Sequence, residues 1–316
     1  MKENLMFQGM EYVYEVYKEK SFSKAAANLF ISQPSLSANV RRVENRIGYP
    51  IFDRSTKPLG LTECGKQYMQ CVERIMNIER DFSDFINDWE GLKTGSLVLG
   101  GSNLFSSWFL PPMIAAFAAR YPHIQIRLVE ESTVKLTKLL QRGMIDLILD
   151  NTYLDPEIFD NRLYQEEHLI LAVPRSFSIN KDLKEFQLSV CDIQTGKFLG
   201  SDFPSVPFSR FRNEPFIMLK QENDTGKRAI NICRENNFDP VVVFEMDQQM
   251  TSYNVTCSGM GISFIGDIMV SKVSPDPNVV YYKLPLKDNC RNICFYWKKG
   301  RYLSRAMEEF LKMSKK

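Results

Sequence analysis

Residues 21–44 read SFSKAAANLFISQPSLSANVRRVE, a pattern typical of two short helices joined by a tight turn. Ser23 is placed to cap the first helix and Ser32 to cap the second, because serine oxygens accept hydrogen bonds from the free N–H groups of a first turn. Pro34 falls in the first turn of the second helix, where its missing N–H costs nothing. The stretch therefore predicts a helix-turn-helix, and such a helix pair indicates DNA binding.

The second helix is predicted to have one apolar and one polar face. Leu36, Val40, Val43 and Ile47 recur at spacings of four, three and four, which places them on the core-facing side. The opposite face carries small, amide and cationic side chains, which can reach base edges and phosphates in a major groove. The candidate DNA-binding residues of this helix are Ser32, Gln33, Pro34, Ser35, Ser37, Ala38, Arg41 and Arg42.

The local charge supports this interpretation, although the charge of the whole chain does not. The sequence has 316 residues and a net charge of +2, which is not typical of a nucleic-acid binder. Between Ser32 and Lys57, five cations stand against two anions, a local net charge of +3. A basic run is also typical of a solvated helix face, but the capped helix pair ahead of it favours DNA.

The order and spacing of these residues resemble those of the LysR-type transcriptional regulators. The resemblance implies a winged helix-turn-helix, with residues 52–62 as the wing and Arg54 facing the DNA backbone or the minor groove. One departure is Ala38, where the family usually has a polar residue, so base readout there is expected to be apolar, for instance toward a thymine methyl. The residues that carry the resemblance are Ser21-Phe22, Ala25-Ala26, Leu29, Ser32-Gln33-Pro34, Ser37, Glu44, Gly48, Phe52, Arg54, Leu61-Thr62 and Gly65.

The stretch after the wing has the apolar spacing of a coiled coil. The apolar positions alternate at intervals of four and three over nearly four heptads, which predicts a long helix with one narrow seam. Packing of this seam against its own chain is the alternative. The resemblance implies a dimerising linker helix, so a homodimer or homotetramer is expected. The seam positions are Cys64, Tyr68, Cys71, Ile75, Ile78, Phe82, Phe85 and Trp89.

A glycine-bounded segment at residues 91–95 marks a change in organisation, and short β-rich runs then alternate with helical periods. This alternation predicts right-handed crossovers, a mostly parallel sheet and two α/β lobes. The expected fold class is α/β with an N-terminal, mostly α-helical winged helix-turn-helix domain. The expected domains are a DNA-binding domain at 1–63, a linker helix at 64–91 and a two-lobed domain at 92–316. Lobe I is expected at 92–165 and 267–316, and lobe II at 166–266.

Six short motifs follow in order along the second half of the chain: Leu110-Pro111, Phe117, Tyr121-Pro122, Gly143-Met144-Ile145-Asp146-Leu147, Glu214-Pro215-Phe216-Ile217 and Gly259-Met260-Gly261-Ile262. With these motifs the second half resembles the effector domain of the same family, which is similar to a periplasmic binding protein. The resemblance implies that a small-molecule effector binds between the lobes, where helix N-termini offer free N–H groups to an anion. Gly266 stands where a proline is common in the family. The candidate effector-binding residues are Ser102, Asn103, Ser132 and Thr133 of lobe I and Phe203, Pro204, Ser205 and Thr251 of lobe II.

Serine and threonine side chains in this set indicate a carboxylate or a similar anion as effector. The resemblance also implies double-stranded promoter DNA as a partner and RNA polymerase as a candidate partner. Seven cysteines, an odd number, and no signal peptide at the start of the sequence predict a reduced, cytoplasmic protein. No apolar run is long enough to span a bilayer, so no membrane partner is expected.

No cofactor, metal site or catalytic residue is expected, and the chain is not expected to be an enzyme. Cys290 and Cys294 have no histidine near them in the sequence, and His123 and His168 are the only histidines. An enzyme with a metabolite cleft would need an acid, base or nucleophile that cannot be identified. A solute-binding protein would share the two lobes but not the basic helix pair.

A thiol-redox-switched regulator of the same architecture is the remaining alternative. It would use Cys191, Cys233 and Cys257, although buried inert thiols are the commoner case.

Overall fold

The computed structural model describes residues 6–89, 95–285 and 289–314. The chain divides into two compact units, unit 1 at Met1–Ser83 and unit 2 at Asp84–Lys316. The predicted boundary after residue 91 lies outside the described residues. None of the helices within the described ranges combines the length and apolar character that a membrane span requires.

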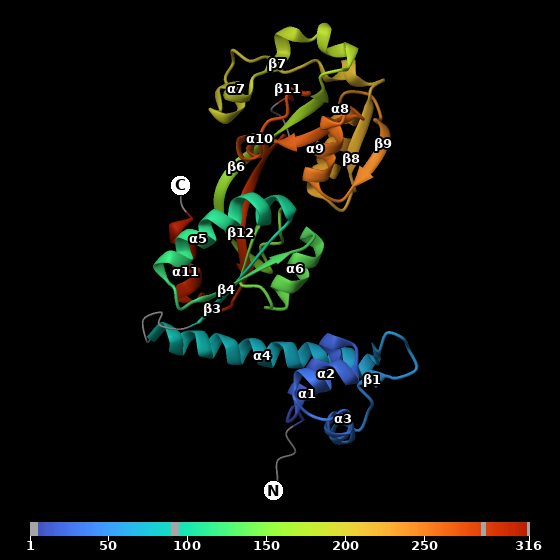
Figure 1. Ribbon diagram of the computed structural model, residues 1–316, viewed down its shortest axis with the longest axis vertical. Coiled ribbons are helices and arrows are strands. Elements are labelled where there is room, and N and C mark those ends of the chain that lie inside the picture. Colours follow the sequence, from blue (N-terminus) through green and yellow to red (C-terminus); the bar gives the residue numbers. More distant parts are fainter. Residues whose placement is uncertain (1–5, 90–94, 286–288, 315–316) are drawn as a thin grey trace. The chain divides into compact units, whose positions relative to one another are not determined.

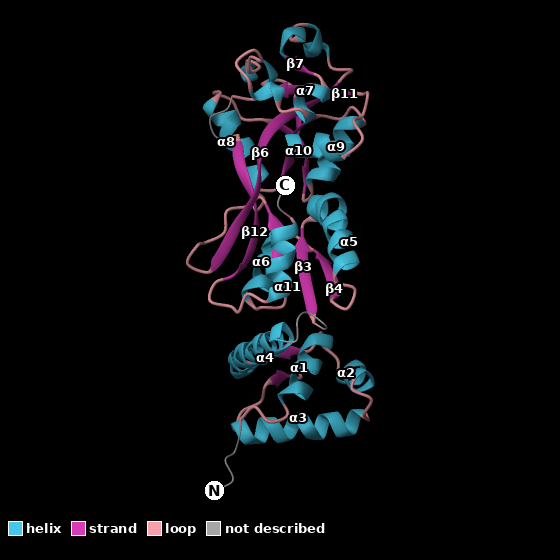
Figure 2. Ribbon diagram, turned by 90° about the vertical axis from the view of Figure 1, so that its left-hand side faces the viewer, coloured by secondary structure: helices cyan, strands magenta, loops and turns pink. Residues whose placement is uncertain are grey.

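Unit 1 is a winged helix-turn-helix, as predicted. Helix α3 lies at one edge of the unit, and α1 and α2 both pack against its inward side (Figure 2). The two short strands pair antiparallel, and residues 54–59 between them form the wing. The elements are α1 (Met10–Glu19), α2 (Phe22–Asn28), α3 (Gln33–Ile47), β1 (Phe52–Asp53), β2 (Gly60–Leu61) and α4 (Glu63–Trp89), which continues into unit 2.

The helix caps agree with the sequence prediction at α3 and differ at α2. Ser32 caps α3 by accepting a hydrogen bond from the Ser35 N–H at 3.3 Å. The cap of α2 is Ser21, whose oxygen accepts from the Lys24 N–H at 3.4 Å, so the prediction of Ser23 was wrong by two residues. Ser23 lies inside the first turn because the helix begins earlier, at Phe22.

The first turns of α4 belong to the core of unit 1. Tyr68, Met69 and Val72 are buried with apolar residues of α1, α2 and α3. Gly65 permits this packing, because a Cβ at that position would overlap the backbone carbonyl of Ile51. The predicted boundary at residue 63 therefore separates residues that share one hydrophobic core.

Unit 2 contains a mixed sheet with two halves, and the long strand β6 (Phe159–Pro174) belongs to both halves. The first half, β4-β3-β5-β12-β6, forms lobe I, and the second half, β6-β10-β8-β9 with β11 and β7 beside it, forms lobe II. Figure 1 shows β6 and β12 running side by side from one lobe toward the other. The strands are β3 (Ser96–Gly101), β4 (Gln125–Glu130), β5 (Leu147–Asp150), β7 (Gln187–Leu188), β8 (Pro215–Leu219), β9 (Val241–Met246), β10 (Ile262–Gly266), β11 (Val279–Lys283) and β12 (Cys290–Lys298).

The crossovers between parallel strands are helical, as the alternating pattern predicts. Both β4 and β5 pair parallel with β3, and both β9 and β10 pair parallel with β8. The α-helices of unit 2 after α4 are α5 (Leu110–Arg120), α6 (Thr133–Gln141), α7 (Val190–Gln194), α8 (Asp224–Glu235), α9 (Gln249–Cys257), α10 (Asp267–Lys272) and α11 (Arg305–Met313). A short π-helix at Phe105–Phe109 precedes α5, and 3₁₀ helices occupy Ser178–Lys181, Lys184–Phe186, Lys197–Leu199 and Phe208–Phe211.

Two features of the sheet differ from the sequence prediction. The strands β10, β11 and β12 all pair antiparallel with β6, so the sheet is mixed where a mostly parallel one was expected. Strand β11 belongs to lobe II, because it pairs with residues 170–174 of β6, whereas lobe I was predicted to resume at residue 267. The prediction missed the length of β6, whose polar first half lacks a continuous apolar run.

Candidate functional sites

The polar face of α3 is exposed, as the sequence pattern predicts. Leu36, Val40 and Val43 are buried in the core of unit 1. The candidate DNA-binding residues on the opposite side are exposed, except Ser37, which is partly buried. Helix α3 therefore presents amide, hydroxyl and guanidinium groups to the outside while its apolar stripe holds it in place. The exposed candidates are Ser32, Gln33, Pro34, Ser35, Ala38, Arg41 and Arg42.

Arg54 is held at the base of the wing. Its guanidinium lies 3.2 Å from the Glu44 carboxylate and 5.4 Å from the ring centroid of Phe22. The other oxygen of Glu44 accepts hydrogen bonds from the N–H groups of Ile51 and Phe52. The Arg54 side chain is still 42% exposed, so it is oriented without being removed from solvent.

Phe30, in the turn between α2 and α3, was not among the predicted site residues. Its side chain is 96% exposed and its backbone has φ of 54°, a left-handed conformation that a bulky residue rarely adopts. The turn geometry that imposes this φ cannot be deduced from the residue type.

A cleft of about 410 Å³ opens in unit 2 at the carboxyl ends of the parallel strands. Its volume is in the range of small-molecule sites. Lobe I contributes residues that follow β3 and β4, and lobe II contributes residues that follow β8 and β9. The lining residues are Ser102, Ser132, Thr133, Val134 and Lys135 from lobe I and Lys220, Glu222, Asn223, Asp247 and Gln248 from lobe II.

Three helices begin at this cleft. The N-cap residues of α6, α8 and α9 are Ser132, Asn223 and Gln248, and all three line the cleft. The side chains of Ser132 and Gln248 make no capping hydrogen bond. The first turns of α6 and α9 thus point N–H groups without side-chain caps toward the cleft. Helix α8, whose Thr225 N–H is capped by the Asn223 side chain, adds its positive dipole end, and the arrangement favours an anion.

The two lysines at the cleft are each paired with a carboxylate. Lys220 lies 2.9 Å from Asp247, and Lys135 lies 3.0 Å from Glu131. The hydrogen bond that Lys220 donates to the Asp247 carboxylate, together with the charge of that carboxylate, raises the pKa of Lys220, so this ammonium is charged at neutral pH.

The structure places the predicted lobe I residues at or near the cleft. Ser102, Ser132 and Thr133 line it, and the Thr133 hydroxyl donates to the buried carboxylate of Asp150 at 2.8 Å. Asn103 is not among the lining residues, and its amide donates to Glu130 at 2.9 Å.

The predicted lobe II residues lie elsewhere. The Phe203 carbonyl accepts a hydrogen bond from Lys283, and the Ser205 hydroxyl donates to the carbonyl of Leu284. Pro204, between them, and Thr251, on α9, are also absent from the lining. In their place the structure brings Lys220, Glu222, Asn223, Asp247 and Gln248 to the cleft. The sequence offered one way to find these residues: they follow the β-rich runs that form β8 and β9, and residues after parallel strands line such clefts.

A buried ion pair joins the lobes where β6 and β12 run together. Glu167 of β6 and Arg291 of β12 are paired, with 0% and 1% of their side chains exposed. Arg291 also lies 3.1 Å from Asp224 and donates to the Thr225 hydroxyl at 2.8 Å, both in lobe II. The amide of Asn151, which follows β5 of lobe I, donates to Glu167 at 3.0 Å. This network connects side chains of both lobes through the two connecting strands.

The structure explains why glycine stands at position 266, where LysR-type regulators commonly have a proline. A Cβ at Gly266 would overlap the carboxylate of Glu167. The ion pair of Glu167 and Arg291 therefore requires a residue without a side chain at the end of β10.

Two of the three cysteines named for a redox switch, Cys233 and Cys257, do not favour one, while the third, Cys191, is exposed. Burial raises the pKa of Cys233 to about 12 and that of Cys257 to about 11. Both thiols are therefore protonated at neutral pH, whereas the thiolate is the reactive form.

Comparisons with known proteins agree with both halves of the structure. Residues 7–66 match the family described as bacterial regulatory helix-turn-helix protein, lysR family, and residues 90–316 match the family described as LysR substrate binding domain. The chain is 28% identical over 312 residues to an uncharacterized HTH-type transcriptional regulator, YcgK, of Bacillus subtilis (strain 168), covering 97% of this chain and 93% of that protein. It is 31% identical over 273 residues to a probable RuBisCO transcriptional regulator of Trieres chinensis, covering 84% and 82%.

Solved structures share the fold at low sequence identity. A full-length OxyR variant from Pseudomonas aeruginosa superposes with a TM-score of 0.71 at 17% identity, covering 97% of this chain and 93% of that one. Full-length CbnR complexed with its target DNA superposes with a TM-score of 0.61 at 16% identity, covering 98% of each chain.

Proposed function

The chain belongs to the LysR family of transcriptional regulators, and from this premise we propose that it binds a pseudo-palindromic promoter site as a dimer or tetramer and responds to a small organic anion. It is a DNA-binding transcriptional regulator with an effector-binding domain. The observation that supports the DNA-reading part of the proposal is the exposed polar face of α3, held by a buried apolar stripe. In helix-turn-helix proteins the corresponding helix lies in the major groove.

The dimer proposal rests on the second half of α4. Along the predicted seam, Ile78 is 67% exposed, Phe82 is 62% exposed and Phe85 is 43% exposed, while the earlier seam residue Tyr68 is buried in the core of unit 1. The side chain of Trp89 lies outside the described residues. Large apolar side chains at coiled-coil spacing favour pairing with the same helix of a second chain. Two such chains place two reading helices on one duplex.

The proposed effector is a small carboxylate or a similar anion. Three helix N-termini, two lysines and the hydroxyls of Ser102, Ser132 and Thr133 meet in the cleft. A ligand that touches both lobes binds more tightly to the lobe arrangement in which it makes more contacts, and so favours that arrangement. Its effect on DNA binding cannot exceed the difference between its affinities for the two arrangements, typically about 1–3 kcal/mol.

The decisive experiment for the DNA proposal compares duplexes from the chain's own promoter region with unrelated duplexes, at two salt concentrations and with the oligomeric state recorded. Preference by about a thousandfold or more for one pseudo-palindromic duplex, bound by a dimer or tetramer, supports the proposal. Weak, salt-sensitive binding without preference, in the presence and absence of small carboxylates, would contradict it.

Replacing Arg54 by alanine is expected to weaken binding to all DNA sequences equally. The guanidinium at the base of the wing would contact phosphate, so its loss lowers the steepness of log K against log salt by about one unit.

Gln33→Ala is the contrasting variant: it is expected to relax preference at one base position, at a cost of about 1–3 kcal/mol. Fluorescence anisotropy on cognate and random duplexes across a salt series measures both effects. If Gln33→Ala lost equal affinity for cognate and random DNA, Gln33 would position the helix without reading sequence.

Replacing Lys220 by glutamine is expected to remove effector binding. A panel of small aliphatic and aromatic carboxylates is screened by thermal unfolding of the full chain at constant ionic strength. A carboxylate present at about 100 times its Kd raises the Tm by roughly 5 °C or more. Lys220→Gln is expected to lose most of this rise, because one cation of the cleft is removed. Lys138→Gln removes the same charge from an exposed position of α6 outside the cleft and keeps the rise. Stabilisation of Lys220→Gln equal to that of the unmodified chain would refute the assignment.

A further inference from the structure

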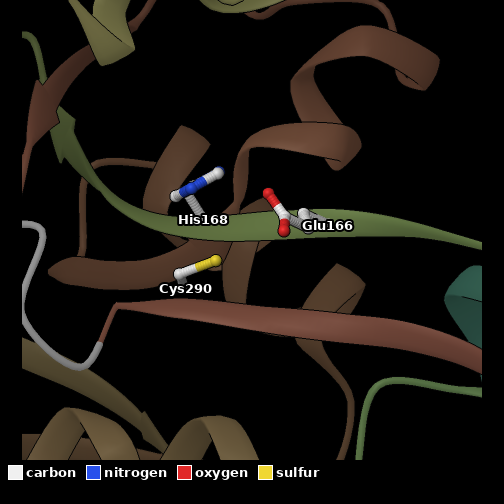
Figure 3. Close-up of side chains that lie close together, drawn as sticks. All are labelled: Glu166, His168 and Cys290. Carbon is white, nitrogen blue, oxygen red and sulfur yellow. The ribbon is translucent and has the colours of Figure 1, made fainter. Parts of the chain in front are cut away.

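Three side chains that are typical metal ligands lie together where β6 and β12 meet. Glu166 and His168 alternate with Glu167 along β6, so they point to the face opposite the buried ion pair. Strand β12 begins at Cys290, which stands directly opposite His168 in the antiparallel register. The ligand atoms of Glu166, His168 and Cys290 all lie within 4.8 Å of one another, and Figure 3 shows the imidazole, carboxylate and thiol grouped beside the two strands.

Asp267, the first residue of α10, holds the imidazole from a third element. One of its oxygens accepts hydrogen bonds from the N–H groups of His168 and Ile268, and the other lies 3.4 Å from Nδ1 of His168. A carboxylate on Nδ1 leaves Nε2 of the same ring to bind a metal, which is the usual arrangement around metal-bound histidines. His168 also packs edge-on against Phe198, so its ring is fixed from two sides.

We propose that Glu166, His168 and Cys290 bind a divalent transition metal ion of the zinc class, with Asp267 orienting the histidine. One thiolate, one imidazole and one carboxylate match the ligands that Zn²⁺ takes, and three protein ligands leave the fourth tetrahedral position to water. The thiolate and imidazole disfavour Mg²⁺ and Ca²⁺, which prefer all-oxygen ligands. Bond lengths of about 2.0–2.3 Å place the ligand atoms of such an ion roughly 3.3–3.6 Å apart. The ligand atoms lie up to 4.8 Å apart in the structure, so side-chain rotations that move each atom by about an ångström bring them to bonding distance.

The position of this site gives it a structural consequence. His168 is the last β6 residue that pairs with β12 before β6 turns to β10, since Leu169 pairs with Gly266. A metal ion there ties β6 to β12 at the point where the sheet passes from lobe I to lobe II. On the other face of the same strands lies the pair of Glu167 and Arg291. Metal binding would therefore favour one relative arrangement of the lobes, and through it one state of the cleft.

The expectation of no zinc site rested on distance along the chain, because no histidine lies near Cys290 in the sequence. In the fold, the register of β12 on β6 places His168 opposite Cys290, although the two residues are 122 positions apart in the sequence. Sequence proximity was therefore the wrong criterion for this pair.

The test uses the reduced, full-length protein after removal of metal by chelation, titrated with Co²⁺ alone without oxygen. We expect a thiolate-to-cobalt charge-transfer band that saturates at one Co²⁺ per chain. Cys290→Ser is expected to lose the band, while Cys191→Ser, which changes another exposed thiol, keeps it. Asp267→Asn is expected to weaken Co²⁺ binding by about 10–100-fold, because it perturbs the group that orients the histidine.

A second measurement on the unmodified chain covers the case in which a variant fails to fold. Alkylation of the thiols is followed by peptide mass spectrometry with and without Zn²⁺. Selective slowing at Cys290 by tenfold or more, with Cys191 unchanged, supports the site. The proposal is overturned if no charge-transfer band saturates at one equivalent, if the band survives Cys290→Ser, or if Zn²⁺ leaves the alkylation of Cys290 unchanged.

Discussion

Replacing Arg291 by methionine is expected to lower the free energy of unfolding of unit 2 by about 3–5 kcal/mol, the usual cost of leaving one partner of a buried ion pair alone. The methionine fills much of the volume of the arginine, but the carboxylate of Glu167 stays fully buried and, within the described part of the chain, keeps only the hydrogen bond from the Asn151 amide. Asp224 and Thr225 of lobe II also lose their bonds to the guanidinium. Urea unfolding of the full chain, followed by tryptophan fluorescence of unit 2, measures the loss.

The pH dependence of this loss identifies its cause. Burial raises the pKa of Glu167 and the charge of Arg291 opposes that rise, so removing Arg291 raises the pKa further. The pKa of a glutamate in the unfolded chain is about 4.3. When the pKa of that glutamate is higher in the folded protein, the free energy of unfolding falls as the pH rises above about 4.3. The difference between the unmodified chain and Arg291→Met is therefore expected to be largest near pH 7 and to shrink toward pH 5.

The control is the double variant Glu167→Leu with Arg291→Met, which removes both charges. It is expected to recover much of the lost stability, because an apolar pair of similar volume leaves no isolated charge. If the double variant were no more stable than Arg291→Met at neutral pH, the loss would come from packing and not from an unpaired carboxylate.

The parts of the molecule that local chemistry decides could be predicted from the sequence. The stripe of Leu36, Val40 and Val43 on α3 and the cap at Ser32 follow from helix periodicity and first-turn hydrogen bonding. The resemblance to the effector domain, rather than local chemistry, placed Ser102, Ser132 and Thr133 at a cleft along the carboxyl ends of the strands, and all three line the cleft.

What the sequence did not reveal depends on long-range strand pairing. The register of β12 on β6 brings Arg291 to Glu167 and Cys290 to His168, and neither strand has the short, uniformly apolar pattern that sequence reading detects. The same pairing places β11 in lobe II. Local patterns define elements, whereas register is set by the fit of the whole sheet.

Replacing Ile78 by aspartate is expected to separate the proposed dimer and to lower affinity for the promoter site by about 100-fold or more. Ile78 is a seam position of α4 with 67% of its side chain exposed, so in the proposed dimer a charge there would be buried against the same helix of a second chain. A single chain then binds one half-site without the gain of the linked second contact. Sedimentation velocity gives the oligomeric state, and anisotropy on the promoter duplex gives the affinity.

The matched control is Ser83→Asp, which adds the same charge to an exposed position on the outer side of the same helix. It is expected to remain oligomeric and to bind the promoter duplex almost normally, because position 83 follows the seam residue Phe82 and points away from the seam. Binding of Ile78→Asp to a single half-site should equal that of the unmodified chain, since the core around α3 is untouched. A fully oligomeric Ile78→Asp with unchanged promoter affinity would show that chains pair through another surface. The exposed apolar face of α4 would then need a different explanation.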